Sequence, residues 1–235
     1  MNVCTHQTAV VWQNSTSLNP KESLMNTKIS RRTALAGGFG LAMAGFMADV
    51  AAAAEAAPEK CWKYVKLDPA KVAQAAYDAF GANGCMYGAV KGAISVFAET
   101  TTCPNDKAAA QSFPFFAFRY GRGGCAKLKE ICGAINGAVL FMSCFVEDFA
   151  EIPALAKKLA DWAAETELPT FVPADDKYPD FLKVKAGGIT CAVMGKAWMS
   201  AATDEQKKIV GERCKRHTAS IMGKAVEILN EFYAG

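Results

Sequence analysis

The stretch Cys132-Gly133-Ala134-Ile135-Asn136-Gly137-Ala138 combines one cysteine and two glycines with apolar residues. It lies inside an apolar run with helical spacing, so we expect a long helix over about residues 125–149. Glycine lets a backbone approach a bulky object closely, and a cysteine beside it can bind or exchange electrons with that object. The stretch therefore predicts a helical chain whose thiols lie where segments pack most closely.

On both sides of this stretch, helical segments alternate with helix breakers. Asp68-Pro69 is an N-cap followed by proline at the first helical position, and Thr203-Asp204-Glu205-Gln206 resembles a capping box. Strand signals are almost absent, and prolines make residues 168–180 an extended connection and residues 100–116 a loop. The expected helices cover about residues 69–80, 85–98, 125–149 and 153–166, a segment after Gly188 that carries Cys191 and Trp198, and about 203–232. The predicted fold class is all-α: a compact helical domain with glycine-rich helix starts converging on a cysteine cluster.

Four cysteines, each in a separate segment and usually beside a glycine, are the candidate site residues. They are Cys85, Cys132, Cys191 and Cys214. Dispersed thiols that converge on one point can hold a metal or exchange electrons. Cys85 falls at a predicted helix start, where free N–H groups and the helix dipole favour a thiolate.

The remaining cysteines are expected to have other roles. Cys125 lies seven residues before Cys132, on the same face of the predicted helix, whereas Cys144 is rotated away and is expected in the core. Cys61 and Cys103 lie in loops, and a disulfide between them is left open. His217 follows Cys214 by three residues, but the basic residues around it favour a solvated surface position over ligation.

Several functional classes are disfavoured by what the sequence lacks. No Cys-x-x-Cys occurs, which argues against a thioredoxin-like dithiol and a zinc ribbon, and the absence of Cys-x-x-Cys-His excludes covalent c-type haem. The net charge is only +3 and the basic residues are scattered, so nucleic acid is not an expected partner. No hydrolase or nucleotide-binding motif is present.

The first 57 residues have the features of an export leader that is removed. Ser30-Arg31-Arg32 precedes an apolar, glycine-rich run over residues 34–48, and an alanine tract follows. Paired arginines before such a run indicate the twin-arginine route, so we expect a periplasmic protein with no stable membrane span after processing. Residues 58–235 are expected to form a single cysteine-rich helical domain.

The cysteines and their neighbours together resemble a known family. Gly84-Cys85-Met86-Tyr87-Gly88, Arg119-Tyr120-Gly121-Arg122-Gly123-Gly124, the stretch from Cys132, Ile189-Thr190-Cys191 and Glu212-Arg213-Cys214 occur in the order typical of C_GCAxxG_C_C redox-active proteins. Within that family, the segments are most similar to the split-Soret cytochrome c branch.

The resemblance implies a helical domain whose family cysteines hold an iron–sulfur centre or act as redox thiols. By position, these are Cys85, Cys132, Cys191 and Cys214. That branch carries haem through Cys-x-x-Cys-His, which this chain lacks, so the chain resembles a haem-less relative. Cys125 lies outside the family pattern and is a candidate substitute ligand, and a homodimer like that of the branch is left open.

The leading hypothesis is an exported electron carrier that binds a [2Fe–2S] or [4Fe–4S] cluster through the four cysteines and exchanges electrons with a redox partner protein. Thiolates suit such clusters, and nearby backbone N–H groups would tune the potential. An electron carrier is favoured over a catalytic enzyme. A metal-free thiol–disulfide oxidoreductase is the alternative and predicts an accessible, low-pKa thiol, most plausibly Cys85. A disulfide-stabilised binding module is a third reading and predicts no free thiols.

Overall fold

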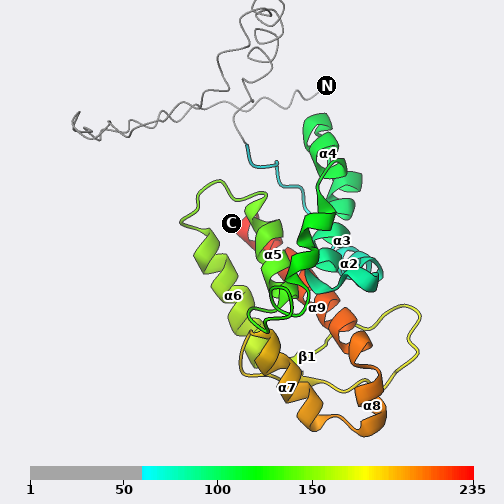
Figure 1. Ribbon diagram of the computed structural model, residues 1–235. Helices are drawn as coiled ribbons and strands as arrows, with labels where there is room; N and C mark the ends of the chain where they lie inside the picture. The colour runs from blue at the N-terminus through cyan, green and yellow to red at the C-terminus, as the bar shows by residue number, and fades with distance from the viewer. Residues whose placement is uncertain (1–59) are drawn as a thin grey trace, which may run out of the picture. The chain divides into compact units, whose positions relative to one another are not determined.

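The computed structural model describes residues 60–235, and the predicted leader over residues 1–57 lies outside them. The described chain is helical, with one two-stranded antiparallel sheet (Figure 1). The elements in chain order are α2 (Pro69–Ala79), the 3₁₀ helix η2 (Gly81–Asn83), α3 (Cys85–Thr100), α4 (Pro104–Gln111), the 3₁₀ helix η3 (Phe115–Gly121), α5 (Gly133–Ser143), α6 (Ile152–Glu165), β1 (Glu167–Leu168), β2 (Val184–Lys185), α7 (Cys191–Ala201), α8 (Asp204–Lys208) and α9 (Val210–Phe232). The all-α prediction is confirmed.

Local sequence signals set several of the helix starts. The side chain of Asp68 accepts a hydrogen bond from the Ala70 N–H at 2.9 Å and caps α2. Thr203 and Gln206 form the predicted capping box at the start of α8. These caps satisfy backbone N–H groups that a helix leaves without partners, so the chain enters each helix at a defined residue.

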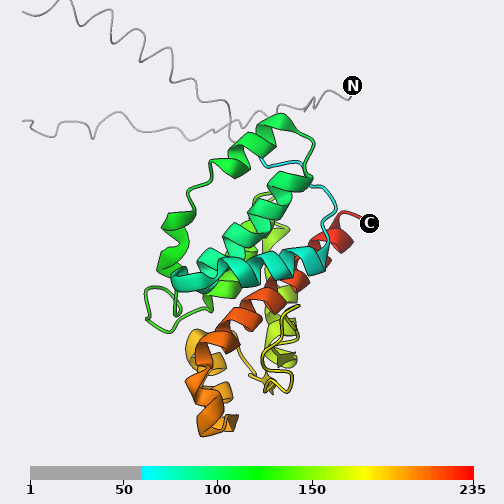
Figure 2. The same cartoon turned by 90° about the vertical axis from the view of Figure 1, so that its right-hand side faces the viewer.

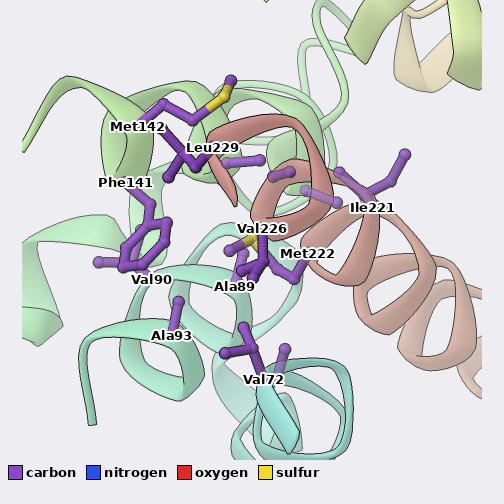
Figure 3. Packing of buried hydrophobic residues seen from close by; sticks show 14 of the residues in the cluster. Val72, Ala89, Val90, Ala93, Phe141, Met142, Ile221, Met222, Val226 and Leu229 are labelled. Atoms are coloured by element: carbon purple, nitrogen blue, oxygen red, sulfur yellow. The ribbon is translucent and has the colours of Figure 1, made fainter. Parts of the chain in front are cut away.

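Helix α3 lies at the centre of the domain and packs against α2, α5 and α9. A Cβ built on Gly88 of α3 would lie 2.8 Å from the Cα of Phe80, so only glycine permits this approach. Figure 3 shows the resulting core, in which Val90 of α3 and Phe141 of α5 lie near Val226 of α9. Burial of this apolar surface is the main stabilising contribution to the fold.

The two ends of the domain are formed by different helices. Figures 1 and 2 place α4 at one end and α7 with α8 at the other. Aromatic side chains fix the segment before α2: Trp62 stacks on Phe97 with ring centroids 5.2 Å apart, and Tyr64 stacks on Tyr233 at 4.6 Å. Within residues 60–235, no helix is both long enough and apolar enough to cross a bilayer.

The predicted helix over residues 125–149 is wrong in its extent. Helix α5 starts only at Gly133 and ends at Ser143. Residues 123–127 have positive φ angles between 48° and 71°, which a right-handed helix cannot contain. The predicted loop over residues 100–116 instead contains α4 and the start of η3, and the final helix is interrupted at Ile209 between α8 and α9.

Candidate functional site

One cavity of about 240 Å³ is lined by all four of the predicted site residues. They come from four different parts of the chain and are Cys85, Cys132, Cys191 and Cys214. Within residues 60–235, no three histidine, cysteine or acidic side chains are close enough to hold a single metal ion. The thiols therefore surround a space and do not converge on one point.

Helix starts place three of these thiols. Cys85 is the first residue of α3, Cys191 is the first residue of α7, and Cys132 is the N-cap residue of α5. Cys214 lies near the start of α9. Backbone N–H groups without helical partners and the positive end of each helix dipole favour negative charge at such positions. These helix starts therefore favour negative charge in the cavity.

Backbone pairing brings Cys132 and Cys191 side by side. The Cys132 N–H donates to the Ile189 carbonyl at 2.9 Å, and the Cys191 N–H donates to the Glu130 carbonyl at 2.6 Å. These bonds flank an isolated antiparallel bridge between Ile131 and Thr190. Two thiols that are 59 residues apart in the sequence are therefore held together by main-chain contacts.

Close packing brings Cys85 next to the start of α5. A Cβ built on Gly133 would lie 2.6 Å from the Cys85 Sγ, so a larger residue at position 133 would displace the thiol. The Cys85 thiol itself donates to the Gly121 carbonyl at 3.7 Å. The glycine beside Cys132 is therefore required by the geometry of a neighbouring thiol.

A left-handed segment over residues 123–127 borders the cavity. It is held by main-chain bonds such as Lys127 N–H to the Arg122 carbonyl at 3.0 Å, and Gly123 and Lys129 line the cavity on either side. Non-glycine residues in this conformation cost roughly 1–2 kcal/mol each, and such strain concentrates at functional sites. Cys125 lies in this segment, is exposed and does not line the cavity. Its predicted position on one helix face with Cys132 is wrong, because no helix connects the two residues.

The cavity wall is cationic. Arg122, Lys129 and Arg213 line it, and no carboxylate of the described chain does. Burial raises the pKa of the Cys132 thiol to about 12, and the nearby Cys85 thiol adds to the effect. Burial also raises the pKa values of Cys85 and Cys191. The predicted low-pKa thiolate at Cys85 is therefore wrong, since loss of solvent outweighs the helix start.

Two polar side chains on the cavity wall have buried nitrogen atoms without a hydrogen-bond partner in residues 60–235. His217 is 1% exposed and both of its ring nitrogens are unpartnered, as is the Nε of Arg213. Burial, with the positive charge of Arg213, holds the pKa of His217 well below its usual value, so the ring is neutral. The expectation of a solvated His217 is wrong. Its spacing of three residues from Cys214 was the one sequence signal that pointed to the cavity.

The cysteines outside the cavity form no disulfide within residues 60–235, so the pairing of Cys61 with Cys103 that the sequence leaves open is not found. The Cys61 thiol donates to the Val146 carbonyl at 3.5 Å, near the end of α5, and not toward Cys103. Cys103 is the N-cap residue of α4, and Cys144 donates to the Leu140 carbonyl at 3.5 Å. All eight cysteines in residues 60–235 are free thiols, which removes the main support for a disulfide-stabilised module.

Residues 95–228 match a protein family described as "Putative redox-active protein (C_GCAxxG_C_C)". The chain belongs to this family. The matched residues include Cys132, Cys191 and Cys214, whereas Cys85 lies ten residues before the match and joins the other three only in the folded structure.

A curated relative and a solved structure extend this result. The chain is 30% identical over 226 residues to split-Soret cytochrome c of Desulfovibrio desulfuricans, covering 86% of this chain and 78% of that protein. A solved structure described as "A novel iron centre in the split-Soret cytochrome c" from the same organism superposes with a TM-score of 0.66 at 30% identity. It covers 74% of this chain and 72% of the other. The resemblance seen in the sequence is confirmed, and the protein is a redox-active relative of a cytochrome.

The comparisons correct the expected cofactor. Both relatives are a cytochrome c, which is a haem protein, so they point to haem and not to the iron–sulfur cluster expected in a haem-less chain. The residues that attach haem covalently are nevertheless absent: no two cysteines of this sequence are separated by just two residues. Covalent haem does not fit this chain.

Proposed function

We propose that this protein transfers electrons through an iron centre held in the cavity by Cys85, Cys132, Cys191 and Cys214. The observation that carries the proposal is the convergence of four thiols, from four separate segments, on one cavity with a cationic wall. The choice of iron as the metal rests on the relative, because its solved structure is described as having an iron centre. A redox partner protein would supply and accept the electrons.

The donors and the surrounding charges suit such a centre. Thiolates are soft ligands that bind iron well, and bound iron would supply one-electron chemistry. Four thiolates around Fe²⁺ or Fe³⁺ leave a net negative charge, which Arg122, Lys129 and Arg213 on the wall would offset. Because the thiols now surround a space, binding requires their side chains to rotate inward and lose their protons.

Each thiol also lies in a setting that would tune a bound metal. Cys132 is buried and Cys85 is half-buried, and Cys85 and Cys191 each begin a helix, where backbone N–H groups without helical partners are available to a bound group. Hydrogen bonds to sulfur and exclusion of water set the reduction potential of a thiolate-bound metal. The chain's own part in electron transfer is therefore to hold, neutralise and insulate the centre.

The metal-free oxidoreductase is less well supported. It requires an accessible thiolate as the attacking group. Burial instead raises the pKa values of Cys85, Cys132 and Cys191, so these thiols are protonated at neutral pH and are poor nucleophiles. The cavity is better suited to binding than to thiol–disulfide exchange.

Metal analysis of the purified protein tests the proposal. We expect stoichiometric iron in the wild type and loss of most of it in Cys132→Ser and Cys191→Ser. Cys103→Ser is the matched control, because Cys103 is also buried but lies outside the cavity. An iron-free wild type, or equal loss in all three variants, would refute the proposal. A pyridine haemochrome spectrum showing stoichiometric haem would replace it with a haem centre.

We also propose that the protein acts in the periplasm after export by the twin-arginine route. The support is the Ser30-Arg31-Arg32 sequence and the apolar run after it. Replacing both arginines by lysine should retain the protein in the cytoplasm, and fractionation with immunoblotting measures this. Unchanged periplasmic protein in the double variant would exclude the route.

A further inference from the structure

His217 is the least satisfied buried side chain on the cavity wall. It is 1% exposed, and neither ring nitrogen has a hydrogen-bond partner. A buried polar group left without a partner destabilises the folded state, so folded proteins rarely leave one without a reason. A whole imidazole in this state indicates that its partner is a group that binds in the cavity.

The surroundings of His217 narrow the identity of that group. The ring lines the same cavity as Cys85 from α3 and Cys132 from α5, and Cys214 precedes it by three residues on α9. The charged groups on this wall are cations and include no carboxylate. No hydrogen-bond acceptor within residues 60–235 orients the ring, and His217 forms part of the wall of a space that the four thiols surround.

Arg213 and His217 differ in how they can interact with a group bound in the cavity. The Nη2 of Arg213 donates to the Met194 carbonyl at 3.0 Å and its Nη1 lies 3.8 Å from the Cys214 Sγ, while its Nε is unpartnered. A guanidinium has no lone pair to give, so it can only donate hydrogen bonds. A neutral imidazole can donate a lone pair to a metal, and imidazole is a good ligand for iron. Only His217 is suited to ligation.

We propose that His217 supplies a nitrogen ligand to the iron centre, which then has mixed sulfur and nitrogen ligation. Arg213 acts as a positioning residue that donates a hydrogen bond to a thiolate sulfur. This inference rests on the proposed function, because it concerns the same centre. It adds to that function a ligand that lies outside the four family cysteines.

Pulsed EPR of the iron-loaded protein tests the ligand directly. Protein grown with ¹⁵N-histidine should show ¹⁵N hyperfine coupling in place of the ¹⁴N coupling of unlabelled protein. His217 is the only histidine within residues 60–235, so the coupling can be assigned to it once the leader with His6 is removed. Iron-loaded wild type without histidine coupling overturns the proposal, and this measurement needs no variant.

Substitution supplies a second test. In His217→Gln we expect iron to remain on the thiolates, the nitrogen coupling to disappear and the midpoint potential to shift. Ser220→Ala is the matched control, since Ser220 is also buried on α9 but bonds to the Thr170 and Phe171 N–H groups. Coupling that persists in His217→Gln refutes the proposal. The iron assay separates the two failures: a protein without iron disproves the proposed function itself, whereas bound iron without coupling disproves only the role of His217.

Discussion

Two buried arginines on α9, three residues apart, lie in regions of opposite character. Arg216 is 1% exposed, and its guanidinium is fully used. Its Nε donates to the Glu212 carboxylate at 2.9 Å, its Nη2 forms an ion pair with Asp176, and its Nη1 donates to the Tyr178 carbonyl at 3.3 Å. The protein itself supplies every partner, so this region is complete.

The region around Arg213 is incomplete. Arg213 is 7% exposed and lines the thiol cavity, and within residues 60–235 it has no carboxylate partner and its Nε is unpartnered. The same residue type on the same helix is thus paired on one side and unpaired on the other. Buried charges are normally paired, so the difference indicates that a bound group supplies the missing partner on the cavity side.

Removing Arg216 should have the largest effect on stability. Arg216→Met removes a buried cation and leaves the Asp176 and Glu212 carboxylates without their partner, which destabilises the folded state. Urea denaturation of the metal-free protein measures the change. Arg213→Met should cost much less, because it removes one bond to a carbonyl, a long contact with the Cys214 sulfur and an already unpartnered Nε. Equal losses in the two variants would break the comparison.

The affinity for iron, in contrast to stability, should depend on Arg213. Arg213→Met removes a cation from the cavity wall, and loss of such a second layer of contacts typically lowers metal affinity by about tenfold or more. Competition with a chelator measures the affinity. Lys215→Met is the control, because Lys215 lies over the Tyr77 ring, 3.7 Å from its centroid, and outside the cavity. The same loss of affinity in both variants would assign the effect to net charge.

The loss of stability at acid pH should depend on the ion pair between Arg216 and Asp176. The hydrogen bond from Arg216 lowers the pKa of Asp176. A carboxyl whose pKa is lowered by folding stabilises the folded state. This stabilisation is fully present above the ordinary carboxyl pKa, and it is lost as the pH falls through the lowered pKa. Asp176→Asn should therefore flatten the fall in stability at acid pH, and Asp175→Asn should not. Thermal unfolding between neutral pH and pH 3 checks this, and parallel curves for wild type and Asp176→Asn would contradict it.

The smallest effect is expected at Cys125. This residue is exposed and lies outside the cavity, so Cys125→Ser should leave iron content unchanged and alter stability by at most about 0.5 kcal/mol. Metal analysis and urea denaturation measure both. Loss of iron in this variant would show that the left-handed segment delivers a fifth thiol, and the cavity would then have to be redefined.

The parts of the fold that depend on short-range signals could be predicted from the sequence. Asp68 and Thr203 cap helices as expected, and the glycine-flanked cysteines marked the segments that meet at one cavity. Such features are encoded within a few residues of one another. Periodicity and capping are therefore sufficient to find them.

The predictions that were wrong concern features that depend on residues far away in the sequence. Ala126 and Lys127 adopt left-handed backbone although neither is glycine, and main-chain bonds around the segment hold them there. The burial of Arg216 depends on Asp176, 40 residues away. A run of basic residues indicated a solvated face around His217, and only the packing of α9 shows that this face is buried.

The placement of the four thiols also has a consequence for the time at which the site can exist. Cys85 and Cys214 are 129 residues apart, and the second of them lies on the last helix of the chain. Ribosomes add about 5–20 residues per second, so the last thiol emerges roughly 6–26 s after the first. The nascent chain can offer no complete binding site during that interval. If the proposed iron centre forms, iron must enter after Cys214 has been synthesised, and any protein that delivers it must recognise the folded chain.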